Sequence, residues 1–291
     1  ANGVIKVTTK KGKVGKRKIR TTVEGGIMHV TRTPNYLDSY NYATLYNEAR
    51  ANDGLAPIYS PAQLEGYKNS TGVNDLLYPN VDYMDEFTRK QSFYRKATVE
   101  FIGGSKNMKY AMVAGYTGAN GLEKLGERQN LNRLNLRGNL EIRITDYMNI
   151  RAGVGARLEI KDWGSKDGTG IYNAISTNRP NEYPFTIAPD AIGLPPTEDG
   201  VPYFGTSDRF SDNLYADVVY GGNSSERYMS SQADFGLDLD FNKYVKGLTA
   251  EGYLTFDNYN ITRQSLSNVY PTYDIRPYMD ETGSEQILFT Q

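Results

Sequence analysis

The clearest feature of the chain is a strict alternation of apolar and polar residues. Between positions 133 and 144 the even positions carry Leu, Gly or Ile, and the odd positions carry Arg, Asn or Glu. The same alternation returns over 148–161 and 229–242. Because successive side chains of a β-strand point to opposite faces, each segment is expected to form a strand with one apolar and one charged face.

Further segments read as strands joined into hairpins, which brings the total to roughly seven. These segments are about 17–32, 92–102, 108–117 and 248–262. Short connections are expected near 103–107, 145–147 and 243–247, and longer ones at 33–91, 118–130 and 162–227. Tight turns at one edge and long loops at the other are typical of transmembrane β-barrels.

Strand length favours the membrane interpretation. The alternation lasts roughly 12 residues per strand, against about 5–6 in soluble proteins. At about 3.3 Å per residue and a tilt of about 40°, such a strand spans about 30 Å, the thickness of the bilayer hydrocarbon core. Aromatic residues near the strand ends suit the membrane interfaces; they are Tyr147, Trp163, Phe241 and Tyr244. We therefore predict an all-β fold, a transmembrane antiparallel β-barrel.

The two faces of these strands are expected to have different environments. The residues predicted to face lipid are Leu134, Leu136, Leu140, Ile142, Ile150 and Val154. Those predicted to face a wet lumen are Arg133, Arg137, Glu141, Arg157, Asp234 and Asp238. The alternative is a secreted, soluble carbohydrate-binding β-sandwich, in which the apolar face would pack against a second sheet.

Composition excludes several classes of function. The chain has 291 residues, with 33 Lys and Arg against 34 Asp and Glu, so its net charge of −1 argues against a broadly basic nucleic-acid binder. It has no Cys, which excludes disulfides and thiolate metal sites, and its one His excludes sites built on several histidines. No cofactor and no metal are expected.

The connection at 33–91 is expected to contain short helices. Asp38 or Ser39 is suited to cap a helix that closes at Gly54, and Ser60 followed by Pro61 starts a second one. Both ends look interrupted: a strand is expected at 4–9, and residues 287–291 read as a strand just beginning. We therefore expect a piece of a longer chain.

Four segments, in this order along the chain, carry a family resemblance. They are ANGVIKVTTKKG at 1–12, YATLYNEA at 42–49, DYMDEFTR at 82–89 and Gly103-Gly104-Ser105 followed by Lys109-Tyr110. They resemble the end of the plug domain, the helical insert, a D-W-x-D-x-x-F-R stretch (here with Tyr83 in place of Trp) and a G-G-[ST]-x-x-x-x-Y hairpin. Together they resemble the SusC/RagA branch of TonB-dependent outer-membrane transporters over about the first 160 residues.

The resemblance implies a plugged barrel of about 22 strands. Residues 1–16 would be the last plug strand and linker, and 17–291 the N-terminal part of the barrel, with extracellular loops at about 33–91 and 162–227. It also implies TonB-dependent import of an oligosaccharide or peptide across the bacterial outer membrane, without chemical catalysis. The implied partners are a SusD-like lid lipoprotein, TonB through a segment before Ala1, and outer-membrane lipid.

The long loop at 162–227 is the best candidate for cargo contact, because aromatic rings stack on sugars and pack against peptides. Its candidate residues are Trp163, Tyr172, Tyr183, Phe185, Tyr203 and Phe204. The competing interpretation, which the sequence leaves open, is that these rings pack the loop against itself or against the lid protein.

Three other patterns have plainer interpretations. The acidic residues of 234–240 have a spacing that a carboxylate-pair hydrolase or a calcium site could use, but a lumen wall facing Arg133, Arg137 and Arg157 is favoured. The basic run 10–18 is interpreted as a linker and not as a nucleic-acid site. Gly153-x-Gly155 lies inside a strand, where glycine favours close approach of a neighbour, here expected to be the plug.

Overall fold

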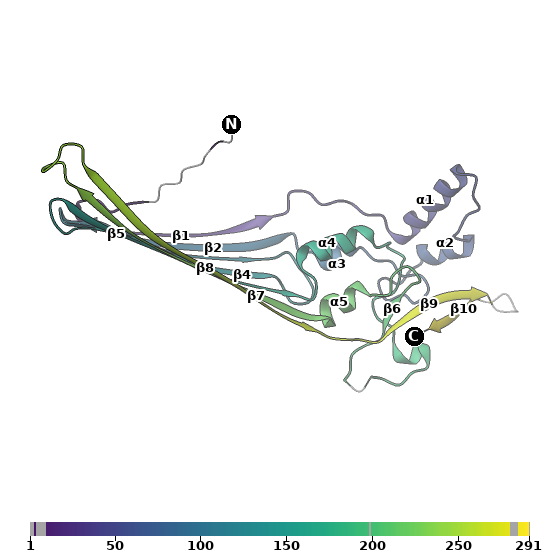
Figure 1. Cartoon of the computed structure of the whole chain (residues 1–291). Helices are drawn as coiled ribbons and strands as arrows, with labels where there is room; N and C mark the ends of the chain where they lie inside the picture. Colours follow the sequence, from purple (N-terminus) through teal and green to yellow (C-terminus); the bar gives the residue numbers. More distant parts are fainter. Residues whose placement is uncertain (1–2, 4–9, 198, 280–284, 291) are drawn as a thin grey trace.

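A single long antiparallel sheet dominates the structure. The computed structural model describes residue 3 and residues 10–197, 199–279 and 285–290. Seven strands follow each other in the sheet in chain order (Figure 1): β1 (Gly15–His29), β2 (Gln91–Gly104), β3 (Met108–Asn120), β4 (Asn130–Arg143), β5 (Met148–Gly164), β7 (Gly222–Asp240) and β8 (Thr249–Ser267). The predicted set of seven paired strands is therefore confirmed, whereas the strand predicted at 4–9 lies outside the described residues.

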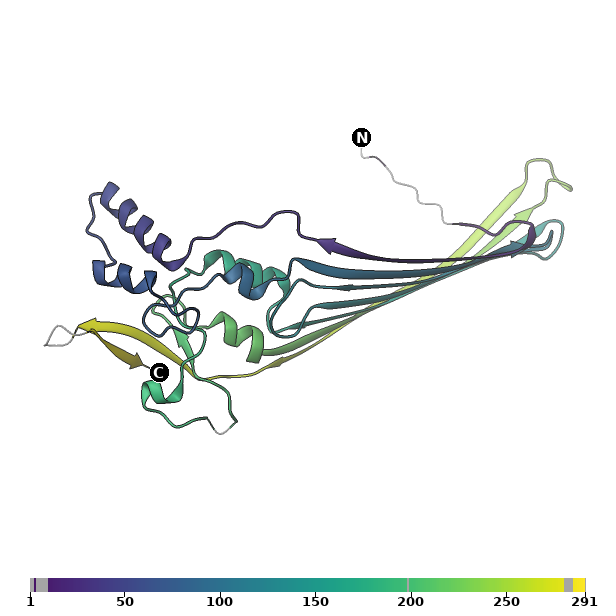
Figure 2. The same ribbon diagram turned by 180° about the vertical axis from the view of Figure 1, so that it is seen from behind.

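The strands are long, from 13 residues in β3 to 19 in β7 and β8. In both views they form one layer over most of their length, with hairpin turns at one end and a group of helices and loops at the other (Figures 1 and 2). We call this group the cap; it contains the described residues of the connections 30–90, 121–129 and 165–221 and the segments 268–279 and 285–290. The asymmetry of connection lengths is thus as predicted.

The boundaries of the second long connection differ from the prediction. Residues 162–164 continue β5 and 222–227 belong to β7, with Asp162 opposite Ser225 and Trp163 opposite Ser224. The apolar alternation stops before these positions. The backbone pairing between β5 and β7 does not depend on apolar side chains and continues to Gly164 and Asn223. The connection therefore runs over 165–221.

The two helices expected in the first long connection are confirmed. In α1 (Ser39–Asn52) the Asp38 side chain accepts a hydrogen bond from the Asn41 N–H at 2.8 Å, and Gly54 follows the helix with a φ of 72°. In α2 (Pro61–Lys68) Ser60 and Gln63 form a reciprocal capping box. Local capping chemistry explains why both helices could be predicted.

The cap holds elements that the sequence pattern did not indicate. They are α3 (Tyr83–Phe87), α4 (Gly168–Thr177), a 3-10 turn (Pro189–Ile192), β6 (Phe204–Thr206), α5 (Leu214–Tyr220) and β9 (Thr272–Met279). β6 and β9 form a second, three-stranded sheet with β10 (Glu285–Thr290), which includes most of the strand predicted at the end of the chain. None of the helices in the described part of the chain is both long and apolar enough to cross a membrane.

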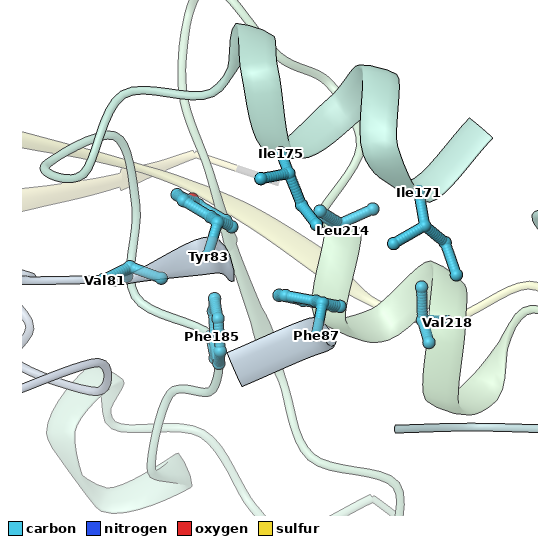
Figure 3. Close-up of a cluster of buried hydrophobic side chains, with 8 residues drawn as sticks. All are labelled: Val81, Tyr83, Phe87, Ile171, Ile175, Phe185, Leu214 and Val218. Atoms are coloured by element: carbon cyan, nitrogen blue, oxygen red, sulfur yellow. The ribbon is translucent and has the colours of Figure 1, made fainter. Parts of the chain in front are cut away.

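The hydrophobic core lies in the cap and not against the long sheet. Side chains from α3, α4, α5 and the loops beside them meet there (Figure 3): Val81, Tyr83, Phe87, Ile171, Ile175, Phe185, Leu214 and Val218. The observed fold is therefore mostly β, as predicted, with a small mixed cap whose own core holds it together.

Candidate functional site

The long sheet has one apolar face, and its side chains are largely uncovered. Strand register puts all six residues predicted to face lipid on this face: Leu134, Leu136, Leu140, Ile142, Ile150 and Val154. Leu136, in the middle of β4, is 44% exposed. Exposed apolar residues continue to both edges of the sheet, with Val23 of β1 at 77% and Leu254 of β8 at 70%. A face of this kind requires an apolar environment from outside the described residues.

This exposure argues against the soluble sandwich. In a sandwich the apolar face would be buried by side chains of a second sheet about 10 Å away. Within the described residues, the only other sheet is the three-stranded one in the cap, beyond the loop end of the long strands (Figure 1). The apolar face is therefore uncovered where a sandwich would bury it.

The opposite face of the sheet is charged. The six residues predicted to face the lumen all lie on it: Arg133, Arg137, Glu141, Arg157, Asp234 and Asp238. Ion pairs connect neighbouring strands across this face. Arg133 and Arg157 both contact Glu159, Lys109 lies 2.8 Å from Glu141, and Arg151 bonds Asp238 at 2.7 Å and also Glu251. Because the side chains of each pair are partly exposed, the pair contributes at most about 1 kcal/mol to stability. The same exposure leaves the charged face accessible to water and solutes.

The carboxylates of Asp234 and Asp238 on β7 are parts of this wall. Asp238 is bound to Arg151, whereas the sequence pattern predicts Arg133, Arg137 and Arg157 as the facing cations. Gly153 faces Asp234, whose carboxylate would lie 2.2 Å from a Cβ placed there. The glycine therefore makes room for a neighbouring side chain of the same sheet, and close approach of a plug at this position stays a prediction. No group of three His, Cys, Asp or Glu residues within the described ranges could hold a metal ion.

Residues 10–14 cross the charged face before β1 begins. The Lys10 ammonium lies 2.5 Å from the Glu100 carboxylate, and the Asn139 amide donates to the Lys10 carbonyl at 3.0 Å. The backbone of Gly12 lies against β3, where a Cβ would come within 2.3 Å of the Tyr110 nitrogen. Residues 10–14 are thus held against the wall by an ion pair, a hydrogen bond and a glycine contact, and residues 15–18 of the basic run belong to β1. That the run links a plug to the barrel stays a prediction.

Gly12→Val is expected to release this linker from the wall. The valine side chain would overlap the β3 backbone, an overpacking cost of about 1–3 kcal/mol that corresponds to roughly 5- to 150-fold more open linker. Trypsin cleavage after Lys10 and Lys11, followed by mass spectrometry, measures the change. Gly252→Val is the control, because nothing lies within 4 Å of a Cβ at Gly252. Equal cleavage of Gly12→Val and the parent would contradict the described contact.

Four of the six predicted cargo-contact residues are interior residues of the cap: Tyr183, Phe185, Tyr203 and Phe204. Phe185 stacks on Tyr215 with 5.1 Å between ring centroids, and Phe204 contacts Tyr270 at 5.3 Å. The Tyr183 hydroxyl accepts hydrogen bonds from Leu214 N and the Asn178 amide, and burial raises the pKa of Tyr183 to about 12. For these four residues, the structure favours the packing alternative that the sequence left open.

Trp163 and Tyr172 are the two predicted contact residues that remain accessible. Trp163 is at the loop end of β5 on the charged face, with the Lys161 ammonium 5.0 Å from its ring. Tyr172 is 49% exposed on α4. Both lie where the charged face meets the cap, so they could contact a solute that approaches the wall from the loop end.

Two polar residues that sequence reasoning missed organise the cap. Asn213 is fully buried, caps α5 and donates to the carbonyls of Pro184, Phe185 and Gly205. Asp75 accepts four hydrogen bonds from Thr71, Leu77 and Tyr78, which outweigh the effect of burial and lower the pKa of its carboxyl. Both Asn and Asp are common loop formers, so nothing in the local sequence marked these two.

Comparison with known proteins adds a relative and a set of structural neighbours. TonB-dependent receptor P3 from Formosa agariphila is 25% identical over 300 residues, which covers 94% of this chain and 27% of that protein. The structure of the RagAB peptide transporter matches 88% of this chain and 30% of its own, with a TM-score of 0.59 and 16% identity. The RagAB peptide importer in its 'open-open' state matches with a TM-score of 0.55 and 17% identity. No family model matches the chain.

The resemblance to SusC/RagA-type TonB-dependent transporters is confirmed. The likeness to the RagAB structures shows the fold, and the likeness to the receptor extends over almost the whole chain, beyond the first 160 residues that carried the sequence motifs. The chain spans about a quarter of the length of the relative that it matches. The fold of the long sheet is therefore similar to that of part of the RagAB structure. The cargo and the partners of this chain do not follow from the likeness in fold and remain proposals.

Proposed function

We propose that the chain is the beginning of the barrel of a TonB-dependent importer in the bacterial outer membrane. The observation that carries this proposal is the long sheet itself, apolar and uncovered on one face and charged on the other. In a membrane barrel the apolar face of such a sheet contacts lipid and the charged face contacts water, so both faces are solvated at once. The likeness to a TonB-dependent receptor and to the RagAB structures supports it.

In this proposal the six apolar residues from Leu134 to Val154 contact lipid, and the charged face from Arg133 to Asp238 lines a wet lumen. The hairpin turns lie on the periplasmic side. The cap, including the connections 30–90 and 165–221, lies on the extracellular side, where Trp163 and Tyr172 contact cargo. Residues 1–16 are the end of a plug and its linker, and further strands close the barrel to about 22.

Partners and cargo follow from the same comparison. The matched structures are of the RagAB peptide transporter, which supports a peptide cargo. A SusD-like surface lipoprotein over the cap and an oligosaccharide as the other cargo class are proposed from the SusC/RagA resemblance of the sequence. TonB would act through a segment preceding Ala1, and no nucleic acid or enzymatic step is involved. Movement of the plug would be transmitted to residues 10–14, whose contacts with Glu100 and Asn139 hold the linker to the wall.

Uptake measurements test the proposed function. Cells that express the protein with its neighbouring transport components are given fluorescently labelled oligopeptides or oligosaccharides, with and without a proton ionophore. Accumulation in the periplasm is expected with at least one cargo class and is expected to stop when the ionophore removes the proton gradient. Cell fractionation is the companion measurement, in which the protein is expected in the outer membrane and released only by detergent. Recovery in the soluble fraction would contradict the proposal.

A further inference from the structure

A cavity in the cap is lined by residues other than the six predicted cargo-contact residues. It has a volume of about 340 Å³ and lies between the segment that leads into α1, the start of α3 and the end of α4, with Arg209 beside it. Cavities of this size accommodate one sugar unit or one amino-acid residue. It opens within the end of the molecule that the proposed function assigns to the cell exterior.

Two guanidinium groups line this cavity, and only one of them has an acidic partner. Arg179 lies 3.7 Å from Glu182 and over the ring of Tyr46, and its Nε atom is buried without a hydrogen-bond partner among the described residues. Arg209 is exposed, its guanidinium lies 5.2 Å from the centroid of the Phe210 ring, and it forms no ion pair with any residue that the structure describes. Glu182 also accepts a hydrogen bond from Ser207, so its charge is shared. The cavity therefore carries a local excess of positive charge.

Tyr42 supports the proximity of both guanidinium groups. Burial raises the pKa of its hydroxyl, while the positive charges of Arg179 and Arg209 both act to lower it. The placement of Tyr42, Arg179 and Arg209 in the wall of the same cavity agrees with this effect. Tyr36 is fixed at another part of the cavity wall, where its hydroxyl lies 3.0 Å from that of Ser176.

We propose that this cavity binds a carboxylate carried by the cargo, either the terminal or side-chain carboxyl of a peptide or the carboxyl of a uronic acid. The reason is chemical: guanidinium groups present paired N–H donors that match a carboxylate, and tyrosine rings offer flat apolar surfaces to the rest of the ligand. This inference rests on the proposed transport function and narrows its cargo to acidic oligomers.

Binding of paired probes to the protein purified in detergent tests the inference. One pair is trigalacturonate and neutral maltotriose; the other is N-acetyl-trialanine with a free carboxyl and the same peptide as its carboxamide. In at least one pair, the acidic probe is expected to bind roughly tenfold or more tightly than the neutral one. The pair that shows this preference identifies the source of the carboxylate, and a preference in both pairs means that the cavity reads the carboxylate alone.

Arg209→Gln is expected to reduce that preference roughly tenfold, as for the loss of one charge-assisted hydrogen bond. Because Arg209 is exposed and forms no ion pair with any described residue, the Arg209→Gln variant is expected to fold. Arg179→Gln is a second variant, and Arg143→Gln, at the hairpin end of the molecule, is the matched control and should leave the preference unchanged. Equal binding of acidic and neutral probes in both pairs, or an unchanged preference in both cavity variants, would overturn the inference.

The binding and uptake measurements together separate a failure of this inference from a failure of the proposed function. If the acidic preference is absent while uptake of any cargo still depends on the proton gradient, the cavity assignment fails and the transporter stands. If the cavity variants lose the preference while uptake is insensitive to the ionophore, the cavity stands and the transport proposal fails.

Discussion

Leu136→Arg is expected to destabilise the protein in a phospholipid bilayer by about 2–4 kcal/mol. Leu136 is the seventh of the 14 residues of β4, on the apolar face between Ala114 and Ala156 of the neighbouring strands. In the proposed orientation this position lies near the middle of the hydrocarbon core, where an arginine would lose most of its hydration. Equilibrium unfolding with denaturant in phospholipid vesicles measures the loss.

The matched control is Gln232→Arg. Leu136 on β4 is opposite Ala156 on β5, and Ala156 is opposite Ser231 on β7, the residue that precedes Gln232. Gln232 therefore lies at nearly the same level of the sheet as Leu136, but the side chain of Gln232 is on the charged face. It stands between Gly155 and Asp257, so an arginine there has both space and an acidic neighbour. Little change in the free energy of unfolding is expected. Equal destabilisation by both variants, or by neither, would show that the two faces do not meet lipid and water respectively.

Asn213→Ala is expected to destabilise the cap by about 2–4 kcal/mol. Asn213 donates to three buried carbonyls, of which Gly205 is the nearest at 2.7 Å, and accepts from the N–H groups of Tyr215 and Ala216. Alanine would leave all five backbone groups without this partner in a site closed to solvent. The core cluster of the cap contains no residue of the long sheet. The stability of the long sheet is therefore expected to change much less than that of the cap.

Hydrogen–deuterium exchange measures this effect separately in the cap and in the sheet. Faster exchange is expected over 183–187, 203–206 and α5, with β3 and β4 unchanged. Asp38→Ala is the control: Asp38 caps α1 with an exposed side chain, so its loss should cost about 1 kcal/mol and affect α1 alone. Unchanged exchange in the cap of Asn213→Ala would mean that water or another group replaces those hydrogen bonds.

Cap residues also show where sequence reasoning stopped. Phe185 and Phe204 were predicted as cargo-contact residues and are buried in the cap, because nothing in the sequence separates a ring that packs from a ring that binds. Their burial depends on α5 and Tyr270, which lie far along the chain. Arg179 and Arg209 escaped notice for the same reason, since each alone is an ordinary polar loop residue.

By itself, the sequence determined the seven strands of the long sheet, the apolar and the charged face of that sheet, and the first two helices. The period-two alternation fixes which side chains share a face, and the caps of α1 and α2 are local interactions between residues three positions apart. Tertiary structure alone decided the pairs across the charged wall, such as Arg151 with Asp238, the burial of four predicted contact residues, and the cavity beside Arg179. These depend on contacts between residues distant in sequence, which no local pattern encodes.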